Sequence, residues 1–583
     1  MDLSLNALRA GYLAGTLDPE RLCAELDMRA ESCLDHNIWI HRLTPAERAP
    51  YLARLAQTDP RVLPLYGVPF AIKDNIDLVG IPTTAACPDY SYLPQGSAFV
   101  VERLTALGAI PMGKTNLDQF ATGLVGSRSP YGATRNAWNA EWISGGSSGG
   151  SAVACAKGLV SFALGTDTAG SGRVPAALNG LVGVKPTRGL ISLSGVVPAC
   201  QSLDCVSIFA GNATDASAIL ACAAGHDARD PWSREGEALS LSGAAFRYGV
   251  PRQLEFFGDL EAPRLFAAAC ARLQALGGEE IEIDFEPFLE AARLLYEGPW
   301  VSERYAALER FIAEKPESLF PVTLAIIGAG RDKRAVDLFK AQHRLQALKH
   351  RTDQVLAGCD CVLTPTLGRP HTLAAVAADP VRLNSELGHY TNFMNLLDYS
   401  AVALPAGIGT AGVPWGVTLF APAFADPRLL DLGGRFLGQS GSDTAPTQPR
   451  QRESATETTL VVCGAHLSGL PLNGELLARG GRLVRACRTA PVYRLHALAG
   501  GPPHRPGLTR DAARGAAIEV EEWALPRAAL GDFMAGVPAP LAIGRVELED
   551  GSRPHGFLCE AHALHNAEEI TALGGWRAYL ARA

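Results

Sequence analysis

The chain has 583 residues, of which 47% are hydrophobic and 19% are charged, and its formal net charge is −8 at pH 7. This length exceeds the roughly 250–300 residues at which a single core stops growing, so a globular protein of at least two domains is expected. The acidic balance, without a long run of Lys or Arg, argues against a partner among nucleic acids or anionic membranes. A small molecule is therefore the expected ligand.

The N-terminal residues lack a basic segment followed by an apolar one, and no run reaches ~18 apolar residues, so a cytoplasmic protein is expected. The 13 cysteines are an odd number and include no CxxC pair. The closest two, Cys359 and Cys361, lie in an apolar run. Buried thiols in a reducing compartment explain this pattern better than disulfides or a zinc site.

Up to about residue 440, short β-branched runs alternate with helical stretches, which is typical of an α/β fold with a largely covered sheet. Strands are predicted at residues 68–72, 162–165, 361–364 and 416–420, and helices at residues 263–276 and 301–313.

Residues 441–459 contain no large apolar side chain. Because such a segment cannot bury enough surface to offset the entropy lost on ordering, we predict a linker. It separates a domain at residues 1–440 from a smaller α+β domain at residues 460–583.

The second domain is predicted to begin with a strand at residues 460–465, followed by a Gly/Pro loop, a short helix and further strands. A hairpin is also expected there. Its strand at residues 546–549 turns at Asp550 and Gly551, a dipeptide that tolerates positive φ.

Residues 108–115 match the phosphate-loop pattern GxxxxGK[ST]. A phosphate loop leaves a strand and opens a helix, so that helix N-terminal amides face the phosphates. Here the preceding residues 100–107 have helical apolar spacing, Gly108 suits a helix C-terminus, and Pro111 stiffens the segment. The order is reversed, and nucleotide binding is not favoured.

Residues 145–149 fit GxSxG, the elbow that presents the serine of α/β-hydrolases after a strand. Residues 139–143, which precede it, have poor β-propensity and no apolar alternation. The local context therefore disfavours that fold.

A third interpretation joins two Gly/Ser loops, residues 144–151 and 165–173, across a helix and strand between residues 152 and 164. Small residues let backbone approach a substrate closely. Amides on the second loop could then face one developing oxyanion beside a serine nucleophile. The alternative is that both loops are merely flexible turns. The amides in question belong to Thr168, Ala169, Gly170 and Ser171.

These loops, together with three further segments, resemble the amidase signature family over about 440 residues. The segments are residues 67–76 (GVPFAIKDNI), 113–121 (GKTNLDQFA) and 183–190 (GVKPTRGL). The resemblance implies a mixed, twisted β-sheet covered by helices and a Ser-Ser-Lys catalytic triad.

Motif by motif, the resemblance places the nucleophile at Ser171, the bridging serine at Ser147 and the general base at Lys73. It further implies a cis peptide bond before Ser147. Lys73 closes an apolar strand, where desolvation would lower its pKa and favour the neutral amine. Neutral Lys73 would take a proton from Ser147, which relays it from Ser171.

Other charged residues compete for these roles. Judged by residue type alone, the general base could equally be Lys114, Lys157 or Lys185. Only the resemblance favours Lys73. Asp167 and Arg173 flank the nucleophile, and we expect them to fix the loop backbone rather than to act on substrate.

Residues 294–305 resemble a segment of allophanate hydrolases in which a Tyr and an Arg, here Tyr296 and Arg304, hold the substrate. Pro299 suits the first turn of a helix, which would place Tyr296 just before that helix and Arg304 in its second turn. A guanidinium binds a carboxylate bidentately, as an anionic substrate requires. The alternative is a solvated Arg304 on an exposed helix face.

The domain at residues 460–583 resembles the C-terminal domain of allophanate hydrolases, with a γ-glutamylcyclotransferase-like fold. In that family it is thought to decarboxylate the first product, N-carboxycarbamate, with a histidine as proton donor. His466, in the loop at residues 464–473, is the candidate. A structural histidine, or a domain that serves only dimerisation, are the alternatives.

The hypothesis from the sequence is hydrolysis of allophanate (urea-1-carboxylate) to ammonia and CO2, downstream of urea carboxylation or cyanuric acid degradation, without metal or organic cofactor. The family resemblance also implies a homodimer. Two other functions remain open: hydrolysis of other small amides, and a glutaminase subunit of a tRNA-dependent amidotransferase, which leaves the second domain unexplained.

Overall fold

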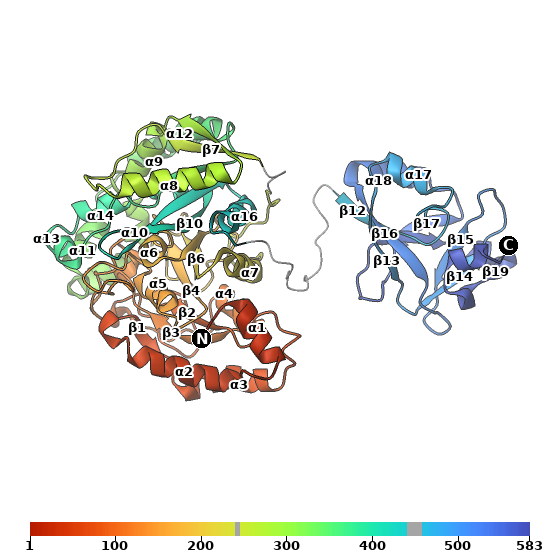
Figure 1. Ribbon diagram of the computed structural model, residues 1–583, viewed down its shortest axis with the longest axis horizontal. Coiled ribbons are helices and arrows are strands. Elements are labelled where there is room, and N and C mark those ends of the chain that lie inside the picture. Colours follow the sequence, from red (N-terminus) through yellow and green to blue (C-terminus); the bar gives the residue numbers. More distant parts are fainter. Residues whose placement is uncertain (240–244, 440–456, 583) are drawn as a thin grey trace. The chain divides into compact units, whose positions relative to one another are not determined.

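The computed structural model describes residues 1–239, 245–439 and 457–582 (Figure 1). The chain divides into two compact units, Met1–Thr444 and Ala445–Ala583. No helix in the described ranges is long and apolar enough to cross a membrane. All 13 cysteines are free thiols, each at least partly buried, as expected.

An 11-stranded mixed sheet runs through the first unit in the order β1-β3-β2-β4-β6-β5-β10-β11-β9-β7-β8. This confirms the predicted fold of a mixed sheet covered by helices. The strands are β1 Trp39–Arg42, β2 Pro69–Lys73, β3 Ile110–Thr115, β4 Phe162–Asp167, β5 Val182–Lys185, β6 Cys205–Ala210, β7 Phe246–Pro251, β8 Gly278–Ile283, β9 Cys361–Pro365, β10 Tyr399–Ile408 and β11 Pro414–Pro422.

Helices surround this sheet, with α2 and α3 at one end of the unit and α8, α9 and α12 at the other (Figure 1). Their bounds are α1 Leu5–Leu13, α2 Pro19–Glu31, α3 Pro45–Ala56, α4 Phe99–Ala106, α5 Gly149–Ala156, α6 Val174–Asn179, α7 Ala213–Ala223, α8 Ala262–Ala275, α9 Glu286–Tyr296, α10 Val301–Glu314, α11 Pro321–Gly328, α12 Ala335–Leu356, α13 Leu373–Ala378, α14 Arg382–Leu387, α15 Phe393–Leu396 and α16 Asp426–Phe436.

The four predicted strands lie in β2, β4, β9 and β11, and the two predicted helices are α8 and α10. Every residue of β2, β4 and β9 is buried. Helices on both faces of a sheet explain such continuous apolar runs, because neither face of the strand meets water.

Residues 108–115 are not a phosphate loop. The helix α4 comes first, Gly108 follows its end with φ 100°, and the rest of the motif forms the buried strand β3. The predicted reversal of order is confirmed. Likewise, only isolated bridges at Trp142 and Ile143 precede the GxSxG segment.

The second unit has a five-stranded sheet, in the order β13-β16-β12-β18-β17, and a three-stranded sheet, in the order β15-β14-β19. Its elements are β12 Glu457–Val462, α17 Asn473–Ala478, β13 Arg482–Arg488, β14 Tyr493–Ala497, β15 Pro506–Arg510, β16 Glu519–Pro526, α18 Arg527–Ala535, β17 Leu541–Arg545, β18 His555–Cys559, β19 Glu568–Glu569 and α19 Trp576–Leu580.

Two predicted boundaries in this unit are corrected. Most of the predicted linker lies outside the described residues, but Glu457–Thr459 already belong to β12, where Thr458 and Thr459 pair with Leu525 and Ala524 of β16. Threonine favours a paired strand even without apolar bulk. The hairpin exists between β17 and β18, but residues 546–549 lie in its connecting loop, where Gly551 has φ 79°.

Candidate active site at the two Gly/Ser loops

Lys73 ends β2, an interior strand of the sheet that runs parallel to both of its neighbours, β3 and β4. The carboxyl ends of parallel neighbours meet at one edge, so Lys73 emerges beside the loop that follows β4. Its side chain is fully buried, and Nζ lies 2.7 Å from Ser147 Oγ and 2.7 Å from Thr166 Oγ1. One amine thus joins the two Gly/Ser loops.

Burial lowers the pKa of Lys73 from its ordinary value of 10.5 to about 7. The buried acids Asp118, Asp204 and Asp167 oppose this shift, while Arg304 adds to it. Among the described residues, Lys73 forms no ion pair. Burial thus lowers the pKa of Lys73 as predicted, and a substantial fraction of its amine is neutral near pH 7.

The competing lysines have other partners. Lys114 Nζ pairs with Asp74 at 3.0 Å, and Lys185 Nζ donates to the carbonyl of Pro186 at 2.8 Å. Lys157 closes α5 and is partly exposed. Lys73 is the one of the four whose amine contacts a serine hydroxyl of the Gly/Ser loops.

Specific contacts hold the loop that carries Ser147 in one conformation. The peptide bond Gly146–Ser147 is cis, as the family resemblance implied, and the Ser147 carbonyl accepts from Asp118 N at 3.0 Å. A Cβ added to Gly146 would lie 2.0 Å from Asp118 Oδ2, so this position requires glycine. Asn179 Nδ2 donates to the Ser144 carbonyl at 2.8 Å and fixes the entry of the loop to α6.

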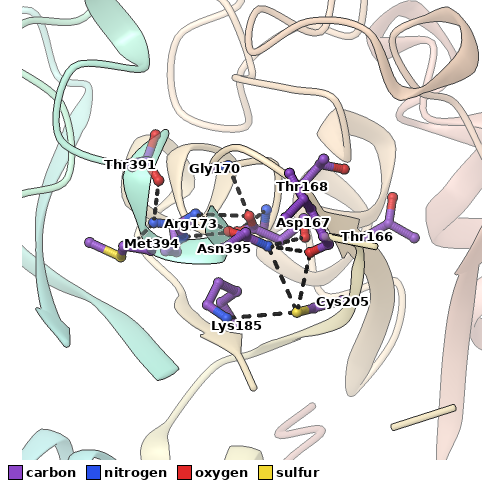
Figure 2. A network of polar contacts seen from close by, with 12 residues as sticks. Thr166, Asp167, Thr168, Gly170, Arg173, Lys185, Cys205, Thr391, Met394 and Asn395 are labelled. Carbon is purple, nitrogen blue, oxygen red and sulfur yellow. Dashed lines mark hydrogen bonds and ion pairs between the residues drawn. The ribbon is translucent and has the colours of Figure 1, made fainter. Parts of the chain in front are cut away.

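Asp167 holds the loop that carries Ser171 (Figure 2). Its carboxylate accepts from Gly170 N at 2.8 Å and Gly172 N at 3.0 Å, and it binds Arg173 through Nε at 2.9 Å and Nη2 at 2.8 Å. Both charged side chains are fully buried. The prediction that Asp167 and Arg173 fix the backbone is confirmed, and the flexible-turn alternative is excluded.

The predicted anion hole needs one correction. Gly170 N already donates to Asp167, because the side chain folds back on its own loop. Thr168 N, Ala169 N and Ser171 N make no hydrogen bond within the described part of the chain. Three of the four predicted amides are thus without a partner among the described residues.

Ser171 itself is 3% exposed, and its hydroxyl makes no hydrogen bond to any described residue. It lies on the loop that follows Thr166, the second partner of Lys73. The structure thus brings Lys73 and Ser147 into direct contact, and it places Ser171 on the adjoining loop without a direct bond to Ser147.

Two buried acids of this site were not singled out from the sequence. Asp118 accepts from the amides of Val125, Gly126 and Arg128. Asp204 accepts from Thr168 Oγ1 and from Ala199 N, and burial raises its pKa to about 6. Asp118 could have been identified from the sequence, because it lies within the segment 113–121 that resembles the family.

Tyr296 is the last residue of α9, and Arg304 lies in the first turn of α10, which begins at Val301. The helix begins where the predicted range 301–313 begins, but Pro299 lies in the connection between the two helices and not in the first turn, so Arg304 is in the first turn and not the second. Arg304 is 2% exposed, its Cζ lies 5.6 Å from the centre of the Tyr296 ring, and Nη1 donates to Thr122 Oγ1 at 3.3 Å. A solvated Arg304 is excluded.

In the second unit, His466 lies in the loop after β12, as predicted. Its ring stacks on Phe557 at 5.2 Å and meets Phe533 edge-on at 5.3 Å, and burial lowers its pKa. Nε2 lies 3.4 Å from a Glu475 oxygen. His466 and Glu475 line a small pocket of about 60 Å³ that also contains Arg505. The histidine therefore lines a mostly apolar pocket that also holds one acid, Glu475, and one cation, Arg505.

Comparison with known proteins adds independent evidence. The amidase family matches residues 35–430, and the family described as the allophanate hydrolase C-terminal domain matches residues 458–581. The urea amidolyase of Saccharomyces cerevisiae is 45% identical over 543 residues, which is 89% of this chain and 30% of that protein. The chain thus spans about a third or less of the length of the urea amidolyases that it matches.

A solved structure of Kluyveromyces lactis allophanate hydrolase is similar over 98% of this chain and 99% of that chain, with 39% identity and a TM-score of 0.74. A glutamyl-tRNA(Gln) amidotransferase subunit of Methanosarcina barkeri is 34% identical over 428 residues, or 68% of this chain and 89% of that protein. The chain belongs to the amidase family, as an amidohydrolase that carries an allophanate hydrolase C-terminal domain and is homologous to urea amidolyase and to K. lactis allophanate hydrolase.

Proposed function

We propose that this chain is an allophanate hydrolase that cleaves the terminal amide of urea-1-carboxylate through an acyl-enzyme on Ser171. The observation that carries the proposal is Arg304, a buried guanidinium that forms no ion pair with a described residue. Burying an unpaired cation costs several kcal/mol unless an anion compensates it. Allophanate brings a carboxylate beside its scissile amide.

The first step uses the Lys73–Ser147 contact. Neutral Lys73 accepts the hydroxyl proton of Ser147 as Ser147 accepts that of Ser171, and Ser171 Oγ attacks the terminal carbonyl. The developing oxyanion is stabilised by the free amides of Thr168, Ala169 and Ser171, with hydrogen bonds that require no reorganisation of the loop.

Collapse of the tetrahedral intermediate breaks the terminal C–N bond. The proton on Lys73 returns through Ser147 to the leaving nitrogen, so that ammonia departs and the acyl group stays on Ser171. A water molecule then attacks the ester, its proton passing to the same relay, and Ser171 is regenerated. The product of this half-reaction is N-carboxycarbamate.

The second unit is proposed to decarboxylate N-carboxycarbamate. His466 supplies the proton that the nitrogen takes up as the C–N bond to one carboxylate breaks and CO2 departs. Arg505 lines the same pocket and is the cation available to hold the remaining carboxylate. The carbamate product then breaks down to ammonia and CO2.

Two alternatives make different predictions. A glutaminase subunit, favoured by the 34% identity to a subunit of an amidotransferase, requires glutamine as substrate. A broad amidase would prefer neutral amides such as acetamide. Comparing ammonia release from allophanate, glutamine and acetamide decides among them, and preference for either of the last two contradicts the proposal.

We further propose a cytoplasmic homodimer acting after the carboxylation of urea or in the breakdown of cyanuric acid. The family resemblance supports the dimer. Light scattering on the purified full chain measures its mass directly, and a monomer at micromolar concentration would contradict that assignment.

A further inference from the structure

Arg128 is a second buried guanidinium close to Arg304. It lies in the loop after Ala121, is 3% exposed, and its backbone is fixed at both ends. Its amide donates to Asp118 Oδ1 at 2.9 Å, and its carbonyl accepts from Gln119 N at 2.7 Å. These two bonds hold the backbone of Arg128 in place whatever the charge of its side chain.

The partners of the Arg128 guanidinium are neutral. Nη1 donates to the Thr122 carbonyl at 3.0 Å and Nη2 to the Pro380 carbonyl at 2.6 Å. Nε is buried and has no hydrogen-bond partner in the described ranges. The charge of Asp118 opposes the burial that lowers the pKa of Arg128, but its carboxylate oxygens bind backbone amides. The cation is thus buried without an ion-pair partner among the described residues, which is unfavourable in the absence of an anion.

Thr122 links the two guanidiniums. Arg128 Nη1 binds its carbonyl oxygen, and Arg304 Nη1 binds its hydroxyl at 3.3 Å. Both cations therefore contact the same buried residue, and neither forms an ion pair with a described acid. The acid next to Arg304 in the chain, Glu303, is bound instead to Ser202 and Cys200.

A pocket of about 170 Å³ opens at this place. Arg128 and Tyr296 line it, and Tyr296 also lies under the Arg304 guanidinium. Asn392 is another lining residue, and its buried Oδ1 accepts no hydrogen bond from the part of the chain that the structure describes. Two of the residues that line the pocket thus carry a buried atom without a partner among the described residues, a donor in Arg128 Nε and an acceptor in Asn392 Oδ1. Allophanate presents the complementary pair, a carboxylate and a urea N–H.

The wall of this pocket adjoins the nucleophile loop. Thr391 precedes Asn392, and a Cβ added to Gly170 would lie 2.4 Å from Thr391 Oγ1. The Thr391 carbonyl also accepts from Arg173 Nη1 at 3.1 Å (Figure 2). A ligand at Arg128 would therefore lie on the same side of the unit as the proposed nucleophile Ser171.

We propose that Arg128 determines specificity for anionic amides by forming, with Arg304 and Tyr296, a subsite with two guanidiniums that binds the substrate carboxylate. The inference rests on the proposed function and adds a residue to it. Since a guanidinium fork matches a carboxylate bidentately, Arg128→Lys should recover only part of the effect of the arginine.

The test compares kcat/KM for allophanate and for biuret, a neutral analogue in which a carboxamide replaces the carboxylate. Arg128→Gln should lower the value for allophanate by roughly 30-fold or more, mainly through KM, because a buried charge contact to substrate is lost. The value for biuret should change little. Arg54→Gln is the control, since Arg54 also donates to two backbone carbonyls, those of Thr105 and Ala106, and does not line this pocket.

An equal loss for both substrates in Arg128→Gln would assign Arg128 a structural role only and overturn the inference. If that variant does not fold, Arg128→Lys is measured instead. An undiminished preference of Arg128→Lys for allophanate over biuret would overturn the inference. Malonamate and malonamide, an anionic and a neutral amide without the urea nitrogen, separate the two proposals. Wild-type preference for malonamate with no allophanate hydrolysis would sink the proposed substrate but keep the anion subsite.

Discussion

Lys73 Nζ lies 2.7 Å from Ser147 Oγ at a fully buried position, and no described carboxylate pairs with it. The same contact suits proton transfer in either direction, provided that the lysine can lose its proton. Burial lowers its pKa to about 7. A histidine is therefore not required for general base catalysis near neutral pH.

The pH dependence of the reaction follows from this pKa. Because the neutral lysine is the active form, kcat/KM should rise with pH and level off above about 7. Ammonia release from about pH 5 to 9 measures the profile. Biuret is the control substrate, because its charge is constant over this range, so any change in its rate reports ionisation of the enzyme. A flat profile, or one that falls across neutral pH, would contradict the role of Lys73.

Asp167→Asn should destabilise the first unit by about 3–5 kcal/mol, because it leaves the buried Arg173 without its ion-pair partner. Urea unfolding measures the loss. Glu314→Gln is the matched control, since it breaks an Arg310–Glu314 pair whose side chains are 90% and 55% exposed, and little change is expected. Similar effects of the two substitutions would disprove the structural role of the buried pair.

Gly146→Ala should cost about 1–3 kcal/mol and abolish activity, because the new Cβ meets Asp118 Oδ2 at 2.0 Å and displaces the loop that carries Ser147. Gly211→Ala, where no atom of the described chain lies within 4 Å of the new Cβ, should leave stability and activity close to wild type. Thermal unfolding and ammonia release are the readouts. An active, stable Gly146→Ala enzyme would mean that the loop adapts and that its geometry is not critical.

Arg304→Gln should lower kcat/KM for allophanate by roughly 30-fold or more while its thermal stability stays near wild type, because the lost cation forms no ion pair with a described residue. Kinetics and calorimetry on the same preparation measure both. Unchanged KM and kcat for allophanate would show that Arg304 does not bind the carboxylate.

His466→Ala should leave the first cleavage intact and slow the release of the second ammonia, because N-carboxycarbamate then breaks down without the proposed proton donor. Time courses of ammonia per allophanate consumed measure this. His562→Ala, at a side chain that is 70% exposed, is the control. Identical time courses for wild type and His466→Ala would remove His466 from the chemistry.

Features that depend on one segment of the chain at a time could be predicted from the sequence. Lys73 ends an apolar strand, and strand and motif together indicated both its position and the direction of its pKa shift. The fold class followed from alternating patterns. The placement of Pro299 in the first turn of α10 was wrong, because proline is as compatible with a connection between helices as with a first turn.

Contacts that depend on loop conformation or on distant segments could not be predicted. Gly170 N is occupied because Asp167 turns back on its own loop, which a pattern of small residues does not reveal. Arg128 and Arg304 meet at Thr122, and Thr122 is 182 residues from Arg304 in the chain. Only the folded backbone brings those guanidiniums together.

The most direct test of the central claim is kcat/KM for allophanate, glutamine and acetamide, measured with the wild-type chain and with Ser171→Ala. The wild-type enzyme should prefer allophanate, and Ser171→Ala should lose on the order of 10⁴-fold or more of that activity, because the nucleophile itself is removed. Preference for glutamine or acetamide, or a Ser171→Ala enzyme that still hydrolyses allophanate, would contradict the account.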